Sequence, residues 1–222
     1  LWLLFHVGRC TDAKRLHYHR LLQRLSRFII YRVPGTRFSL DNSVGEDFSR
    51  PAVIIANHQS HLDLMCILML SPRVVLLTND WVWNNPCYGS LIRNAEYLPA
   101  TKGMDAIMPQ IRSLVERGCS IAVYPEGTRS RDGSVGRFHQ GAFYIAQQLG
   151  LEVLPMYLYG ANKVLKKKTY HLNRWPIYIK VGAAVDQEEL RRLGGLREQA
   201  NTLRHRYERE YQNICNDIEQ HI

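Results

Sequence analysis

Short apolar runs separated by polar and glycine-containing segments dominate the middle of this 222-residue chain. The run from Pro51 to Ala56 is rich in β-branched residues and is typical of a buried parallel strand. Similar runs predict strands near residues 37–40, 52–56, 74–77, 96–98, 120–124, 152–158 and 177–182. Helical spacing predicts helices near residues 61–70, 86–93, 104–117 and 138–149. This alternation predicts an α/β fold with a mixed, largely parallel sheet flanked by helices.

A basic amphipathic segment, residues 1–34, precedes the first predicted strand. Apolar residues recur there at near-helical spacing, at Leu16, Leu21, Leu22, Leu25, Phe28 and Ile29. Residues 1–37 hold eight Lys or Arg and one acid, so they carry +7 of the net charge of +9. We expect a helix that either lies on an anionic membrane surface or packs on the core with a solvated basic face.

A second helical segment, residues 187–222, follows a core that we place at residues 35–186. After Gly194-Gly195, apolar residues step by three or four positions, at Leu196, Ala200, Leu203, Tyr207, Tyr211, Ile214 and Ile218. Six basic and seven acidic residues give the segment a charge near zero. We expect this helix to pack against the core.

The turn after the strand at 52–56 carries the first candidate chemistry, in the segment Asn57-His58-Gln59-Ser60-His61-Leu62-Asp63. Residues five apart on a helix are rotated by about 140° and do not face each other. His58 and Asp63 therefore meet only if His58 lies in the turn and its ring folds back. A carboxylate on one ring nitrogen would fix the tautomer and leave the other nitrogen as a base.

Two other interpretations of this segment stay open. His58 can be a capping or core histidine with Asp63 as a surface charge, or His58, His61 and Asp63 can bind a metal. No further Cys or His follows at a matching spacing, which disfavours the metal. Ser60 is the expected N-cap of the helix, and Pro72 is expected to end it.

The second candidate segment is Tyr124-Pro125-Glu126-Gly127-Thr128-Arg129-Ser130-Arg131, which leaves the strand at 120–124. In open α/β sheets, ligands bind at the carboxyl ends of the strands. Gly127 allows close approach of the backbone, Arg129 can grip a phosphate bidentately, and Thr128 can donate a hydrogen bond. Beside the His58 turn, this loop predicts an anion-binding site.

Together these residues resemble a known family. The His58-x4-Asp63 pair (an HX4D motif) and the run Glu126-Gly127-Thr128-Arg129 are similar to motifs of the glycerolipid acyltransferases, typified by 1-acylglycerol-3-phosphate acyltransferase. The resemblance covers approximately residues 50–186. It extends to Phe138-His139-Gln140-Gly141-Ala142-Phe143 and to Val153-Leu154-Pro155-Met156.

The resemblance implies an enzyme of phospholipid biosynthesis. Such an enzyme moves a fatty acyl group from acyl-CoA or acyl-carrier protein to the hydroxyl of a lysophospholipid, with 1-acylglycerol-3-phosphate as the expected acceptor. By the same resemblance His58 is the general base, Asp63 orients it, and Glu126, Gly127, Thr128 and Arg129 bind the phosphate and glycerol of the acceptor. No metal or organic cofactor is implied, and we expect the oxyanion donors to be backbone N–H groups at the start of the helix after His58.

The segment between the two motifs departs from the family pattern. The usual Gly-x-x-Phe-Ile-x-Arg block, whose Arg binds the acceptor phosphate, has no counterpart in residues 89–102, where the Arg would fall near Ala100. Lys102 is the expected substitute, with Arg93 as the alternative. A lysine is a point charge rather than a fork. The acceptor can therefore be a different lysolipid, and a non-catalytic membrane-associated lipid-binding protein remains the rival interpretation.

Composition restricts the remaining classes. The sequence pI near 9.5 suits nucleic acid or an anionic membrane, but no nucleic-acid recognition motif occurs, so we predict no nucleic-acid partner. The five scattered cysteines include no CxxC pair, which favours a reducing setting. No run of 18 apolar residues occurs, so we expect no complete spanning helix. We predict a membrane-associated protein on the cytoplasmic face of the inner or plasma membrane.

Overall fold

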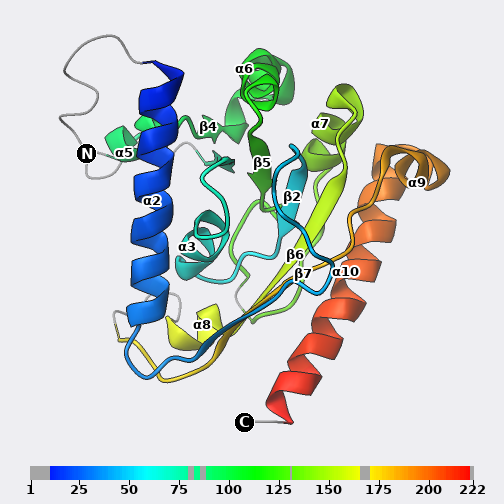
Figure 1. Cartoon of the computed structure of the whole chain (residues 1–222). Coiled ribbons are helices and arrows are strands. Elements are labelled where there is room, and N and C mark those ends of the chain that lie inside the picture. The colour runs from blue at the N-terminus through cyan, green and yellow to red at the C-terminus, as the bar shows by residue number, and fades with distance from the viewer. Residues whose placement is uncertain (1–10, 80–82, 86–88, 131, 166–170, 221–222) are drawn as a thin grey trace.

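A seven-stranded sheet forms the centre of the molecule in the computed structural model (Figure 1). The structure describes residues 11–79, 83–85, 89–130, 132–165 and 171–220, and the side chain of Lys102 is outside this description. Across the sheet the strand order is β1-β7-β6-β2-β5-β3-β4. The strands are β1 (Phe38–Asp41), β2 (Val53–Ala56), β3 (Val74–Thr78), β4 (Leu98–Pro99), β5 (Ser120–Val123), β6 (Val153–Tyr159) and β7 (Ile177–Val181).

Neighbouring strands run parallel except at one place. β2 pairs in parallel with both β5 and β6, and β3 pairs in parallel with β5 and β4. The exception is the antiparallel pair of β6 and β7, beyond which β1 runs parallel to β7. The predicted mixed, largely parallel sheet is therefore confirmed. Every residue of β2 and β6 is buried, as expected for strands covered on both faces.

The strand predicted at 96–98 begins later than expected. Glu96 adopts a positive φ of 58°, and the amide of Tyr97 donates to the carbonyl of Ile92 at 3.2 Å. These residues therefore complete the end of helix α5 (Gly89–Asn94), and only Leu98 and Pro99 join the sheet. The start of the helix predicted near 86–93 lies outside the described residues.

Helices cover both faces of the sheet. α3 (Leu62–Leu68) and α5 lie on one face, and α6 (Met104–Glu116) and α7 (Gly141–Leu149) lie on the other, as this strand order requires for right-handed crossovers. Short helical elements η1 (Ala100–Lys102), α8 (Ala161–Val164) and α9 (Gln187–Arg192) lie in the connections. α7 begins three residues later than predicted, because the amide of His139 donates to the carbonyl of Pro125 and holds the preceding segment against the β5 loop.

The N-terminal helix α2 (Asp12–Arg32) packs against α3. Its buried side chains step by about four residues, at Tyr18, Leu22, Ser26 and Ile30. Two residues of the predicted apolar stripe face outward instead, since Leu25 is 42% and Phe28 is 59% exposed. α2 therefore packs on the core, one of the two expected arrangements, and it also carries apolar side chains that stay exposed.

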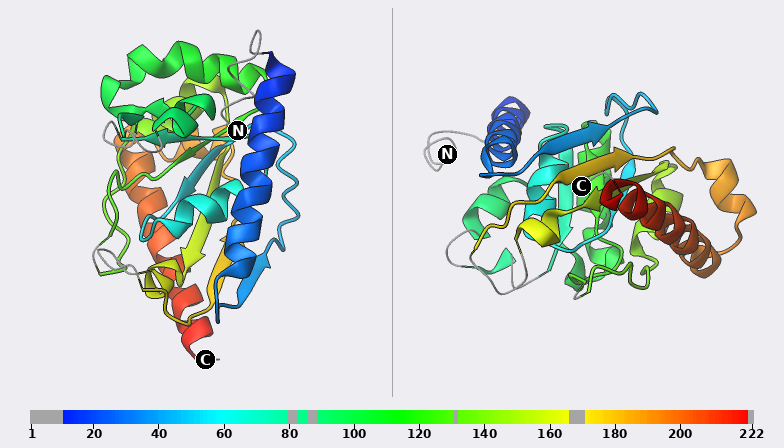
Figure 2. Two further views of the ribbon diagram at one scale, coloured as in Figure 1. Left: turned by 90° about the vertical axis from the view of Figure 1, so that its left-hand side faces the viewer. Right: turned by 90° about the horizontal axis from the view of Figure 1, so that it is seen from below.

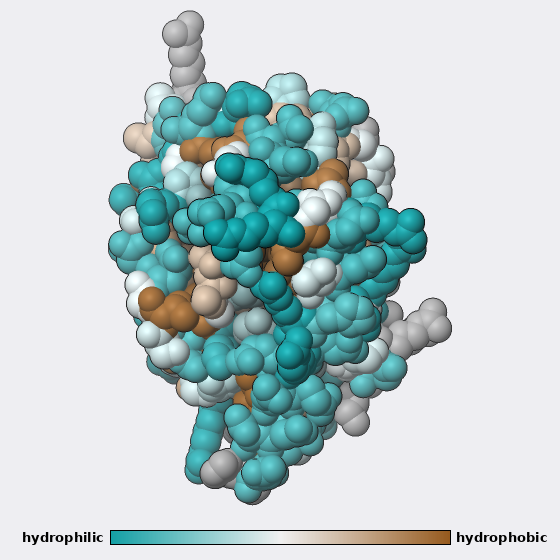
Figure 3. Space-filling view, turned by 90° about the vertical axis from the view of Figure 1, so that its right-hand side faces the viewer, coloured by the Kyte–Doolittle hydropathy of each residue, from teal (hydrophilic) through white to brown (hydrophobic). Residues whose placement is uncertain are grey.

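The C-terminal helix α10 (Leu196–Glu219) lies on the side of the sheet opposite to α2 (Figure 1, Figure 2). It packs on α7 and β6, as predicted, and buries Ala200, Leu203, Tyr207, Tyr211 and Ile214. The molecular surface on this side is largely hydrophilic (Figure 3). Among the described residues, no helix combines the length and apolar character needed to cross a bilayer.

Candidate active site

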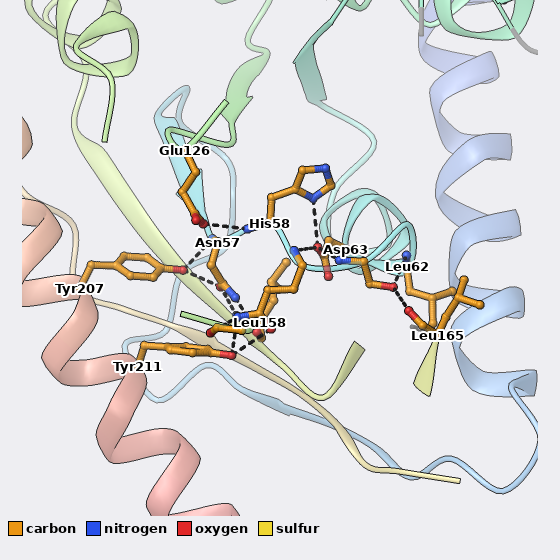
Figure 4. Close-up of polar contacts among 12 residues, drawn as sticks. Asn57, His58, Leu62, Asp63, Glu126, Leu158, Leu165, Tyr207 and Tyr211 are labelled. Atoms are coloured by element: carbon orange, nitrogen blue, oxygen red, sulfur yellow. Dashed lines mark hydrogen bonds and ion pairs between the residues drawn. The ribbon is translucent and has the colours of Figure 1, made fainter. Parts of the chain in front are cut away.

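The His58 ring folds back onto Asp63. β2 ends at Ala56, His58 lies in the turn that follows, and α3 begins at Leu62. The ring nitrogen Nδ1 lies 3.1 Å from Oδ2 of Asp63, whose side chain is 1% exposed (Figure 4). The other ring nitrogen points away from the carboxylate (Figure 4), and the His58 side chain keeps 22% of its surface exposed. With the Asp63 carboxylate as acceptor, the ring proton lies on Nδ1, which leaves the other nitrogen as an acceptor.

Asp63 also fixes the backbone of the turn. Its Oδ2 accepts the amides of Gln59 at 2.6 Å and Ser60 at 2.7 Å. The predicted N-cap, Ser60, is wrong: the helix has His61 at its N-cap without a side-chain capping bond. The Ser60 hydroxyl instead donates to the carbonyl of Leu165 at 3.1 Å. These amides are occupied, so the expected oxyanion donors at the start of α3 are not available at Gln59 and Ser60.

Tyr124, the residue after β5, stacks on the His58 ring. The ring centroids are 4.0 Å apart and the planes differ by 16°. The stack and the bond to Asp63 together restrict the imidazole to one plane. The sequence predicts Tyr124 at the end of a strand but indicates no role for it, because partners on neighbouring strands depend on the strand order.

Glu126 joins the two motifs. One carboxylate oxygen accepts the amide of His58 at 3.1 Å, and the other accepts the amide of Gly136 at 2.8 Å. The residue is buried, and burial raises the pKa of its carboxyl, although the bonds from Gly136 and His58 favour the charged form. Both oxygens are thus bonded to the backbone of the protein itself. Glu126 therefore links the turn that carries His58 to the segment that carries Gly136. Its predicted contact with the acceptor remains a prediction.

The residues after Glu126 are more accessible. Gly127 has a positive φ of 67°, which favours glycine, and both it and Thr128 are exposed. Arg129 is half-buried. Desolvation lowers the pKa of His61, and the positive charge of Arg129 lowers it further. The amide of Ser130 donates to the carbonyl of His58 at 2.7 Å, so this loop lies against the catalytic turn. The edge beside His58 therefore carries an exposed hydroxyl and a guanidinium, groups suited to an anion.

The predicted Lys102 follows β4, at the same sheet edge as His58 but three strands away from β2. At about 4.8 Å per strand this is roughly 14 Å along the sheet. The alternative, Arg93, donates to the carbonyl of Trp83 at 2.7 Å and lines a cavity of about 450 Å³ with Arg15, Glu96 and Arg117. No residue of the two motifs lines that cavity. A phosphate contact by Lys102 remains a prediction.

Metal binding finds no support in the geometry. Oδ2 of Asp63 is bonded to three N–H groups of the turn, and no group of three or more metal-binding side chains occurs among the residues that the structure describes. The absence of a metal from the reaction stays a prediction.

A His–Asp pair and a Glu-Gly-Thr-Arg segment after neighbouring strands of a largely parallel sheet define a domain of the acyltransferase class. The chain belongs to the Acyltransferase family, whose profile matches residues 35–159. Helix α10 lies outside the matched region.

Curated relatives and a solved structure are similar to this chain. The chloroplastic 1-acyl-sn-glycerol-3-phosphate acyltransferase BAT2 of Brassica napus is 32% identical over 161 residues, which cover 69% of this chain and 46% of that protein. The 1-acyl-sn-glycerol-3-phosphate acyltransferase alpha of Homo sapiens is 25% identical over 199 residues, 85% of this chain and 70% of that protein. The chain thus spans less than half the length of the Brassica relative.

The crystal structure of the 1-acyl-sn-glycerophosphate acyltransferase PlsC of Thermotoga maritima superposes with a TM-score of 0.73. The match covers 94% of this chain and 86% of that chain at 20% identity. At this identity the likeness supports the fold.

Proposed function

We propose that this protein transfers a fatty acyl group from a thioester donor to the hydroxyl of a lysophospholipid, with 1-acylglycerol-3-phosphate as the acceptor. The observation that carries the proposal is the His58–Asp63 pair beside the exposed Gly127 and Thr128 and the half-buried Arg129. The names of the Brassica and human relatives support the acceptor. Acyl-CoA and acyl-carrier protein are both suitable donors.

In the proposed mechanism, the exposed ring nitrogen of His58 removes the proton of the acceptor hydroxyl as its oxygen attacks the thioester carbonyl. Asp63 stabilises the imidazolium that forms. Collapse of the tetrahedral intermediate expels the thiolate. The thiolate then receives from His58 the proton that came from the acceptor hydroxyl. No covalent acyl-enzyme is needed because the thioester already has a good leaving group. Arg129 and Thr128 hold the acceptor phosphate, which fixes the hydroxyl against the base.

We also propose that helix α2 holds the protein on an anionic membrane surface, on the cytoplasmic face of the inner or plasma membrane. Its exposed apolar side chains, Leu25, Phe28 and Tyr31, recur every three residues on one side. The exposed Arg24 and Arg27 lie between them in the sequence. Apolar side chains can enter the lipid while the guanidinium groups meet the head groups, which suits an enzyme whose acceptor is a lipid.

The test is an acyl-transfer assay in mixed micelles. Long-chain acyl-CoA and acyl-carrier protein serve as donors, and a panel of lysolipids that includes 1-acylglycerol-3-phosphate serves as acceptors. We expect product with the wild-type protein and a loss of kcat of about 10²-fold or more in His58→Ala, the usual range for removal of a general base. His205→Ala, which removes an exposed histidine from α10, is the matched control and keeps full activity.

The outcomes separate the candidate functions. Product with another lysolipid alone would overturn the proposed acceptor and retain the reaction. Equal rates in wild type and His58→Ala would overturn the role of His58. Lipid binding without product from any pair of substrates would favour the non-catalytic lipid-binding function.

A further inference from the structure

Side chains of helix α10 bind the residues on either side of His58 in the catalytic turn. Tyr207 and Tyr211, four residues apart on one side of α10, reach the two residues that flank His58 (Figure 4). The hydroxyl of Tyr207 accepts the backbone amide of Asn57 at 2.9 Å. The hydroxyl of Tyr211 accepts the side-chain amide of Gln59 at 2.8 Å. His58 therefore lies between two residues that are each bonded to the same helix.

The contact at Asn57 is rigid. Its side-chain amide bonds the backbone of Leu158 in both directions, each bond being 2.8 Å long. The Tyr207 hydroxyl also lies 2.7 Å from Oδ1 of Asn57 and 2.6 Å from the carbonyl of Met156. Asn57 is fully buried and Tyr207 is 1% exposed, so no water competes for these bonds.

The contact at Gln59 extends to the loop that follows the second motif. Its side-chain amide donates to the carbonyl of Gly133 at 2.8 Å as well as to Tyr211. One turn before Tyr207, Arg204 donates to the carbonyls of Val135 and Gly136, each at 3.3 Å. The amide of Gly136 is in turn the donor to Glu126. The same side of α10 thus contacts the supports of both His58 and Glu126.

We propose that α10 is a positioning element of the active site, in which Tyr207 and Tyr211 act through Asn57 and Gln59 to hold His58 at the attacking hydroxyl. The inference rests on the proposed acyl transfer for its kinetic consequences. Neither tyrosine touches the reacting atoms. Burial raises the pKa of both hydroxyls, so they remain protonated at neutral pH and keep these bonds. Because the family profile ends at residue 159, these two residues lie beyond the region by which the family is defined.

The test uses the full chain and removes single hydroxyl groups. Tyr207→Phe, Tyr211→Phe and the double variant keep the rings and hence the packing of α10. The matched control is Tyr159→Phe, which removes a hydroxyl that bonds α10 at Glu219 (2.9 Å) rather than supporting the catalytic turn. In the double variant we expect kcat to fall about tenfold while KM for acceptor and donor stays within about twofold, because only the alignment of the base changes. The control keeps the wild-type kcat.

Amide hydrogen exchange at residues 57–60 supplies a readout independent of activity. We expect exchange of the Asn57 amide to rise at least about fivefold in Tyr207→Phe and to stay unchanged in Tyr159→Phe. An unchanged kcat in the double variant, or an equal fall in the control, would overturn the positioning role. If the wild type itself transfers no acyl group, the proposed function fails and the exchange data decide the inference alone: unchanged exchange in both tyrosine variants overturns it.

Discussion

The carboxylate of Glu126 accepts the backbone amide of His58 across 3.1 Å, so the acid of one motif holds the base-bearing residue of the other. Its second oxygen accepts the amide of Gly136, and both partners are donors. Glu126 therefore accepts both amides, whereas a glutamine in its place has only one acceptor oxygen.

Glu126→Gln presents an amide group to one of these two donors. One buried N–H then loses its acceptor, at a cost of about 1–3 kcal/mol in the free energy of unfolding. The His58 backbone shifts with it, so we expect kcat to fall about tenfold or more. Urea unfolding and steady-state kinetics measure the two effects. If Glu126→Gln has both the stability and the kcat of the wild type, Glu126 does not link the two loops.

The pH dependence of this stability difference has a definite sign. Burial raises the pKa of the Glu126 carboxyl above its ordinary value of 4.5. Between pH 4.5 and the raised pKa, the folded protein therefore retains a proton that the unfolded chain has lost. The contribution of Glu126 to the free energy of unfolding is full below pH 4.5 and decreases as pH rises through the raised pKa. The glutamine variant has no such loss. We expect the stability difference between wild type and Glu126→Gln to shrink between pH 4.5 and 7, and a difference that widens over this range would show the opposite shift.

Asp63→Asn tests the orientation of the base. The asparagine oxygen can keep the three bonds that Oδ2 of Asp63 accepts, but the side chain is neutral and no longer stabilises the imidazolium. We expect kcat to fall about 10²-fold or more, because His58 becomes a weaker base without the adjacent negative charge. Asp105→Asn is the control, since that carboxylate bonds Tyr144 at an exposed position of α6. A kcat within twofold of wild type in Asp63→Asn would remove Asp63 from the mechanism.

Much of the fold follows from the sequence because buried parallel strands have a strong local pattern. The run Val53–Ala56 is apolar throughout and forms β2 as predicted, since both faces of this strand are covered. The His58–Asp63 contact could also be predicted. Residues five apart do not face each other on a helix, so the two side chains can meet only if His58 lies in the turn before the helix.

Other features depend on contacts between distant segments. Tyr124 and His58 stack because β5 and β2 are neighbours, and strand order is not local information. Ser60 is not the helix cap, because its hydroxyl donates to the carbonyl of Leu165, 105 residues away, and that contact is not local information. The bond between Tyr207 and Asn57 joins residues 150 positions apart, and helical spacing showed only that Tyr207 is buried.

Gly127→Ala separates the backbone requirement of the loop from its role at the site. The positive φ of 67° costs a non-glycine residue about 1–2 kcal/mol, and the new Cβ would lie 3.3 Å from Cδ2 of His139. Gly45→Ala is the matched control, with a φ of 71° and no atom within 4 Å of the added Cβ. We expect both variants to lose similar stability by thermal unfolding, and only Gly127→Ala to lose acyl transfer, about tenfold. Equal activities would show that the loop tolerates a side chain beside the substrate.

Membrane binding by α2 predicts separate apolar and electrostatic contributions. Leu25→Ser with Phe28→Ser removes two exposed apolar side chains from α2, and burial of each in lipid is worth about 1.5–3 kcal/mol. We expect this double variant to lose at least about tenfold in partitioning to anionic vesicles at any salt concentration. Arg24→Gln with Arg27→Gln should instead lose affinity at low salt and match wild type at high salt, because surface charges are screened. Val44→Ser, which changes an exposed apolar residue outside α2, serves as the control. Vesicle cosedimentation across a salt series measures all four proteins, and equal binding of the α2 variants and wild type would place the membrane contact on another surface.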